Sequence, residues 1–145
     1  MGDAEDFWPV LEDAEDPNAP VVLLRKQAEK LTEKTGYRLR GRVSTSSILL
    51  DHEGRHALGL DLSGGANPDS FTHVFTIEVP ALDDYSYTLF SVSHGIEPYP
   101  VIYPDAQGGW NALANHEAFT AWLRETLASE RTKRVLKTLS EQAGR

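Results

Sequence analysis

The strictest pattern in the chain is an alternation of apolar and polar positions between residues 71 and 79. One face carries Phe71, His73, Phe75, Ile77 and Val79, and the other carries Thr72, Val74, Thr76 and Glu78. A period of two over nine residues predicts a half-buried antiparallel strand. Pro80 follows directly and ends it.

The segment after this strand alternates too, but its phase slips by one residue. Tyr85, Tyr87 and Leu89 share one phase, and Phe90 and Val92 take the other. A single extra residue in one strand is a β-bulge, so the pattern predicts a return strand with a bulge near Leu89. Val101 to Tyr103 then predicts a further strand. Because Pro98, Pro100 and Pro104 surround it and proline donates no ladder hydrogen bond, we expect that strand at a sheet edge.

Earlier strands are predicted at residues 37–43, 48–50 and 56–62. In the first of these, Arg38, Arg40 and Arg42 fall on one face, opposite Tyr37, Leu39 and Val43. The residues around Gly54 predict a turn between the other two strands.

Helical spacing brackets the strands on both sides. A helix is predicted from Pro20 to Gly36, with Asn18 as its cap and Gly36 in the left-handed conformation at its end. Two more helices are predicted near the C-terminus, capped by Asn115 and Ser129.

The elements together predict an α+β fold: an N-terminal helix, a mainly antiparallel sheet of about five strands in meander order, and two C-terminal helices packed on one face. Residues 20–145 form a single predicted domain, and residues 1–19 form an acidic N-terminal arm.

Charge is distributed unevenly along the chain. Seven of the 22 acidic residues lie within the first 16 positions, which contain no lysine or arginine. The rest of the chain is near neutral, although the whole carries a net charge of −8. A near-neutral body makes nucleic acid an unfavourable partner, whereas the acidic arm favours a basic protein.

The acidic arm also contains an apolar island, Phe7-Trp8-Pro9-Val10-Leu11. Acidic segments with apolar residues are often partner-binding arms. The alternative, which we favour from the sequence, is that Trp8 docks on the domain's own core, because a large exposed ring is unfavourable.

Residue types that carry catalysis do not form a recognisable motif. The chain has no cysteine, and the spacing of Ser91 and Ser93 to His94 matches no catalytic triad. His52, His56 and Asp51 could converge in a turn, but polar turn residues explain them more simply. We therefore predict no catalytic residues, no metal site and no cofactor, and we expect a cytoplasmic protein with no membrane segment.

Two candidate binding surfaces remain. The first is aromatic, since tyrosine and tryptophan are enriched at interface hot spots. It comprises Tyr85, Tyr87, Tyr99, Tyr103 and Trp110, and the alternative is that these rings pack beneath the C-terminal helices. The second is the arginine face of Arg38, Arg40 and Arg42, which could hold phosphate, or could be a solvated or ion-paired sheet face.

The favoured hypothesis is a non-enzymatic protein-binding module, of the immunity, antitoxin or chaperone-like type. Size and element order are similar to those of small acidic bacterial proteins such as secretion chaperones and toxin-immunity proteins, a similarity that involves no specific residues. The competing hypothesis is a nucleic-acid-processing enzyme or phosphate-binding factor that uses the arginine face. A third is a homodimer formed through the edge strand at Val101–Tyr103.

Overall fold

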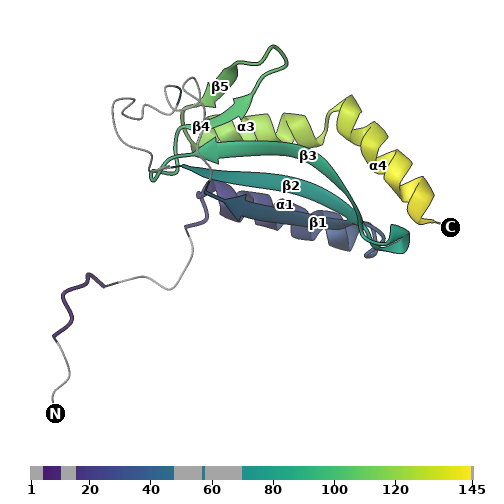
Figure 1. The fold of residues 1–145 in the computed structure, drawn as a ribbon, viewed down its shortest axis with the longest axis horizontal. Coiled ribbons are helices and arrows are strands. Elements are labelled where there is room, and N and C mark those ends of the chain that lie inside the picture. Colours follow the sequence, from purple (N-terminus) through teal and green to yellow (C-terminus); the bar gives the residue numbers. More distant parts are fainter. Residues whose placement is uncertain (1–4, 11–15, 48–56, 58–69, 145) are drawn as a thin grey trace.

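The fold is known from a computed structural model that describes residues 5–10, 16–47, 57 and 70–144 (Figure 1). Its described strands form one antiparallel sheet in the order β1-β2-β3-β4-β5, which confirms the predicted α+β meander. The elements are α1 (Pro20–Lys34), β1 (Arg40–Ser46), β2 (Phe71–Val79), the short 3-10 helix η1 (Pro80–Leu82), β3 (Tyr85–His94), β4 (Val101–Pro104), β5 (Trp110–Leu113), α3 (His116–Leu127) and α4 (Glu130–Ala143).

β2 and β3 form the centre of the sheet, and their register contains the predicted bulge. Phe75 pairs with Phe90 and the next residue, Thr76, pairs with Thr88, so Leu89 is the extra residue in β3. The bulge lets both halves of β3 direct apolar side chains to the same face of the sheet, which is why the phase slips in the sequence.

The predicted edge position of Val101–Tyr103 is wrong. β4 lies between β3 and β5, with Ile102 paired to Ser93 on one side and to Ala112 on the other. β5 was not predicted and begins at Trp110, a residue expected in a loop. A homodimer could pair through Val101–Tyr103 only if β5 first separated from β4.

The first strand begins later than the sequence predicts. Gly36 and Tyr37 both have positive φ, at 61° and 69°, so the chain turns through residues 36–39 before β1 starts at Arg40. The strands predicted at 48–50 and 56–62 lie outside the described residues, apart from Ala57, which is helical.

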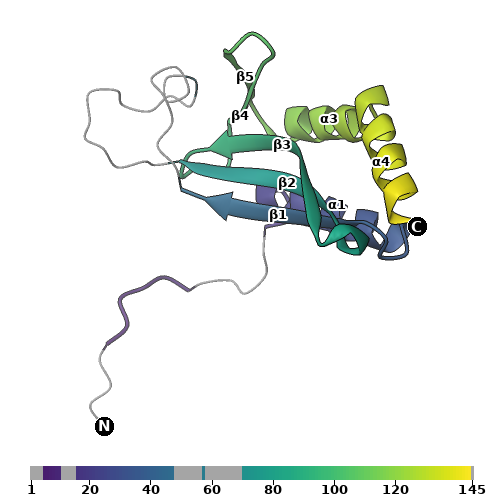
Figure 2. The same cartoon turned by 45° about the vertical axis from the view of Figure 1, so that its right-hand side comes forward.

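All three α-helices of the described chain cover the same face of the sheet (Figure 2). Asn115 and Ser129 cap α3 and α4 as predicted, because their side chains accept hydrogen bonds from Ala118 N at 2.8 Å and Thr132 N at 3.2 Å. Asn18 does not cap α1, whose N-cap is Ala19. The core between sheet and helices centres on Leu24, Phe75, Ile77, Phe119 and Leu139.

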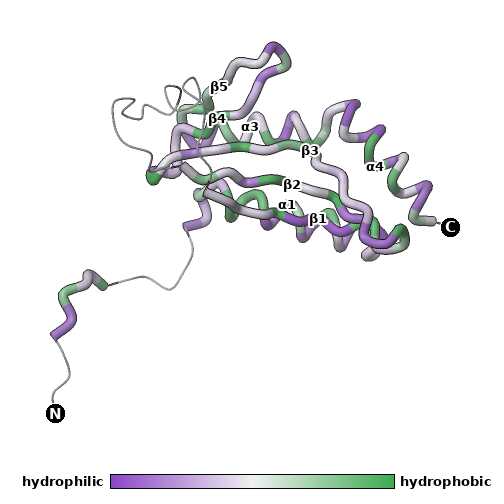
Figure 3. Tube along the Cα trace, viewed as in Figure 1, coloured by the Kyte–Doolittle hydropathy of each residue, from purple (hydrophilic) through white to green (hydrophobic). Residues whose placement is uncertain are grey.

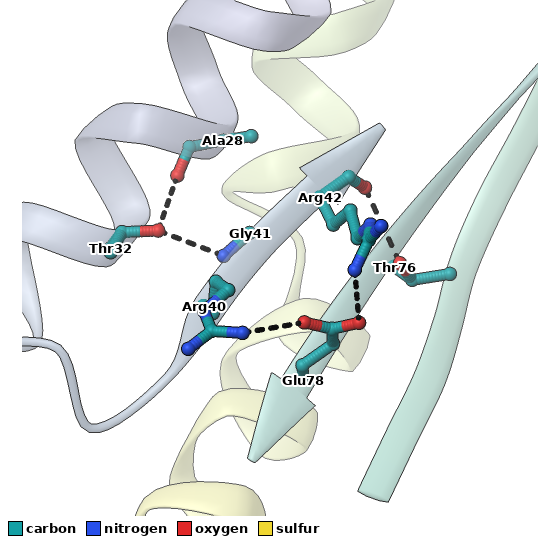
Figure 4. Close-up of polar contacts among 7 residues, drawn as sticks. All are labelled: Ala28, Thr32, Arg40, Gly41, Arg42, Thr76 and Glu78. Atoms are coloured by element: carbon teal, nitrogen blue, oxygen red, sulfur yellow. Dashed lines mark hydrogen bonds and ion pairs between the residues drawn. The ribbon is translucent and has the colours of Figure 1, made fainter. Parts of the chain in front are cut away.

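Helix α1 lies against the outer edge of β1. The backbone nitrogen of Gly41 donates to the Thr32 hydroxyl at 2.9 Å, and that hydroxyl donates to the Ala28 carbonyl at 3.0 Å (Figure 4). A backbone donor that would otherwise be free at the sheet edge is therefore satisfied by a helix side chain, which protects the edge from pairing with another strand.

Within the described ranges, no helix combines the length and the apolar character needed to cross a membrane.

Candidate binding surfaces

Residues 5–10, which are described within the N-terminal arm, lie apart from the domain (Figure 1). Phe7, Trp8 and Val10 are 85%, 80% and 97% exposed. On the tube of Figure 3, the segment 5–10 has both hydrophilic and hydrophobic positions. The preferred expectation that Trp8 docks on the domain's own core is therefore wrong for this conformation. Within the described residues of the arm, these three apolar side chains are almost fully exposed to solvent.

The base of the arm is fixed to the domain by Tyr99. Its hydroxyl donates to the carbonyl of Asn18 at 2.8 Å and lies 3.4 Å from Nδ1 of His116, the first residue of α3. Burial raises the pKa of Tyr99 to about 12, and the negative charges of Asp16 and Glu117 act in the same direction. The hydroxyl therefore remains a donor, and the arm leaves the domain where α1 and α3 both begin.

Tyr85 and Tyr87 lie under α4. Tyr87 is half-buried, and its hydroxyl accepts a hydrogen bond of 3.1 Å from Arg131, whose other guanidinium nitrogen donates to the carbonyl of Leu89 at 3.3 Å. Tyr85 is 51% exposed. Of this pair, Tyr85 offers the larger free surface.

Tyr103 and Trp110 lie further along the sheet. Tyr103 packs on Trp122 of α3 with ring centroids 4.8 Å apart, and Trp110 packs on Ile102. The structure thus places the five predicted aromatic residues at three separate locations, beneath α4, at the start of α3 and around β4, and does not bring them together in one patch. Each of them except Tyr85 is partly buried by a neighbouring element.

The arginine face is divided. Arg40 and Arg42 each form an ion pair with the same carboxylate, Glu78, at 3.3 and 3.2 Å (Figure 4). Arg38 precedes β1 and reaches the carbonyl of Ser140 at the end of α4 at 3.5 Å. The prediction of three arginines on one strand face is therefore wrong for Arg38, and the remaining pair shares a compensating negative charge.

Neutralising Glu78 should release the two guanidinium groups. We expect Glu78→Gln to lower the free energy of unfolding by about 1 kcal/mol, since the arginines are half-exposed, and to raise the salt concentration needed to elute the protein from a heparin column. Glu125→Gln, on α3, makes the same change of charge away from the arginines. Equal elution shifts in the two variants would mean that Glu78 does not restrain the arginine pair.

Two histidines form a buried hydrogen-bonded pair that the sequence did not predict. Nε2 of His73 lies 2.7 Å from Nε2 of His94, Nδ1 of His94 lies 2.7 Å from the carbonyl of Gly95, and Nδ1 of His73 lies 2.9 Å from the Thr45 hydroxyl. A carbonyl only accepts, so His94 donates from Nδ1, and one of the two facing Nε2 atoms donates to the other. In neutral His73, Nδ1 accepts from the Thr45 hydroxyl when Nε2 donates, and donates to that hydroxyl when Nε2 accepts.

The surroundings of His73 favour the neutral form of its ring. His73 is only 3% exposed. Burial, together with the nearby His94 and Arg25, lowers the pKa of His73 to about 4. His73 is therefore neutral at neutral pH, and its hydrogen bonds to Thr45 and His94 link β1, β2 and β3.

Metal ligands do not gather in the described part of the chain: no three residues of the types His, Cys, Asp and Glu lie close enough to hold an ion. The turn histidine His52, its neighbour Asp51 and His56 fall outside the described residues.

Comparison with protein-family models, with curated proteins and with solved structures finds no match for this chain.

Proposed function

We propose that this chain is a non-enzymatic protein-binding module of the toxin-immunity, antitoxin or chaperone-like type. The N-terminal arm is its binding element. The observation that carries the proposal is the exposure of Phe7, Trp8 and Val10 beside the carboxylates of Glu5 and Asp6. Such a segment fits a partner protein whose surface has an apolar groove rimmed by basic side chains.

The energetics suit a reversible complex. Full burial of an apolar side chain of this size contributes about 1.5–3 kcal/mol, and the acidic flanks add attraction that is screened by salt. Ordering an extended segment on a partner opposes these gains, so the expected affinity is moderate and salt-dependent.

The second candidate function, phosphate or nucleic-acid binding by Arg38, Arg40 and Arg42, has less support. Two of its three cations share Glu78 and the third lies at the end of α4. The aromatic surface is also less favoured than the arm, because its members lie at three separate places.

Substituting the central aromatic residue of the arm tests the proposal. The full-length chain is used to capture partners from lysate, and the affinity for each captured protein is measured by calorimetry with wild type and with Trp8→Ala. We expect Trp8→Ala to weaken binding by about 100-fold, as for a hot-spot tryptophan, and to leave the melting temperature unchanged.

Ile96→Ala provides the matched control, because Ile96 is 75% exposed on the domain itself. Tyr85→Ala examines the competing aromatic surface in the same assay. A partner whose affinity falls with Tyr85→Ala and not with Trp8→Ala would move the binding site from the arm to the domain, and the proposal for the arm would be wrong.

A further inference from the structure

Helix α1 and the α3–α4 pair lie on the same face of the sheet (Figure 2). Residues of these helices line a groove between them. Two adjoining hollows of about 240 and 290 Å³ make up this groove, and they share Gln27 of α1 and Leu127 of α3. Its deeper part reaches down to the buried side chains of Phe75 and Ile77.

The groove is apolar inside and cationic at its rim. Leu31, Leu127 and Leu136 line its walls. The exposed side chains of Lys30, Lys34 and Arg124 border it, and none of the described residues that line it is acidic. A ligand that fits has apolar side chains on a segment of negative charge.

We propose that this groove binds the chain's own N-terminal arm, and that this contact competes with the external partner for Phe7 and Trp8. The proposal rests on the function proposed above, because it concerns regulation of the same arm. The arm has the complementary chemistry: exposed Phe7, Trp8 and Val10, and seven acidic residues with no basic one. The position of residues 5–10 in Figure 1, apart from the domain, is then the open form.

The attachment point of the arm lies at one end of the groove. Asn18 is held by Tyr99 beside His116, so the arm emerges where α1 and α3 begin. Trp8 precedes Ala19 by 11 residues, which span up to about 36 Å when extended. Gln27 lies only about 12 Å along α1 from Ala19, and the far end of the helix about 22 Å. An arm that turns back along α1 therefore reaches the whole groove with chain to spare.

Connection within one chain favours this contact over exchange between copies. A segment tethered by a short linker has an effective concentration on the order of millimolar at its own binding site. At micromolar protein, a second copy supplies its arm at roughly a thousandth of that concentration. The occupant is therefore the arm of the same molecule.

Paramagnetic relaxation in the full-length protein tests the contact. The chain has no cysteine, so Ala4→Cys gives a single site for a nitroxide label at the arm. We expect the label to broaden the amide signals of groove residues such as Gln27, Leu31 and Leu127 most strongly. Lys30→Glu with Lys34→Glu should lower the closed population about tenfold, because two attractive charges become repulsive.

Lys26→Glu with Lys137→Glu is the control, since it changes the charge equally at residues that do not line the groove. The same loss of broadening in both double variants, or broadening spread evenly over the domain, would overturn the proposal. In a mixture of nitroxide-labelled protein without isotope and isotope-enriched protein without the label, broadening can arise only between molecules. Broadening in that mixture would assign the contact to exchange between copies and would also overturn the proposal.

Failure of the proposed function can be distinguished from failure of the internal contact, because the relaxation experiment uses the protein without any partner. An arm that docks and has no arm-dependent partner contradicts the proposed function alone. An arm that binds a partner and never contacts the groove contradicts the internal contact alone.

Discussion

Replacing Gly41 with alanine is expected to lower the free energy of unfolding by about 3 kcal/mol, at the upper end of the cost of overpacking. A β-carbon at this position would lie 2.6 Å from the carbonyl oxygen of Ala28 and 2.7 Å from its α-carbon. Both are backbone atoms of α1, so no side-chain rotation relieves the clash, and the helix itself has to move away from β1.

Movement of α1 has consequences beyond the contact itself. Leu24 and Ala28 on the same helix belong to the core, and the Gly41 nitrogen would lose its hydrogen bond to Thr32. Loss of this partly buried hydrogen bond adds a further cost of about 1 kcal/mol.

Urea unfolding of wild type, Gly41→Ala and Gly36→Ala separates crowding from backbone strain. Gly36 has a positive φ of 61° but no neighbour within 4 Å of the added carbon, so its substitution should cost only about 1–2 kcal/mol. Similar costs at both positions would show that α1 packs less closely on β1 than the structure has it.

This close approach explains one limit of the sequence analysis. The period of the residues predicts that Gly41 lies in a strand, and the strand was predicted. The sequence holds no local signal that a helix backbone passes over this glycine, because Ala28 and Gly41 approach only after α1 and β1 pack. Local pattern determined the element and tertiary packing determined the role of the residue.

The strands also show which features local sequence pattern predicts and which depend on tertiary packing. The bulge at Leu89 was predictable, because it changes the phase of apolar residues within one strand. The edge prediction for Val101–Tyr103 failed because Pro98 and Pro100 lie before the paired segment and Pro104 ends it, so the ladder loses no internal donor. β5 has only four residues, too few for an alternation to be recognised.

Candidate sites were less predictable than elements. Whether Trp8 is exposed depends on whether it packs against another surface. The composition of the chain does not determine that contact. The histidine pair depends on register: the extra residue at Leu89 is what turns His94 to the same face of the sheet as His73. Without the bulge, simple alternation would direct His94 to the opposite face.

The second prediction with a large effect concerns the His73–His94 pair. We expect the free energy of unfolding to fall in mild acid because of His73. The pKa of His73 is about 4 in the folded protein and 6.5 in the unfolded chain. Above pH 6.5 both states hold His73 neutral, and the residue makes no pH-dependent contribution. As the pH falls from 6.5 towards 4, the unfolded chain binds a proton that the folded protein does not, so the stability declines by about 3 kcal/mol in total.

The variant His73→Gln isolates this contribution. Glutamine keeps an N–H donor for His94 but does not titrate, so the variant should be about 1 kcal/mol less stable than wild type at neutral pH, through loss of the Thr45 bond. Because it lacks the decline between pH 6.5 and 4, we expect it to be the more stable protein near pH 4.5. Urea unfolding monitored by circular dichroism across this range measures the difference between the two proteins, which removes the common effect of the carboxylates.

A histidine outside the pair provides the control for this crossover. His116→Gln, at the start of α3, should leave the slope of stability against pH between 6.5 and 4 as in wild type. Parallel curves for wild type and His73→Gln would mean that His73 takes up its proton in the folded protein as easily as in the unfolded chain. The burial of His73 beside His94 would then not hold its ring in the neutral form.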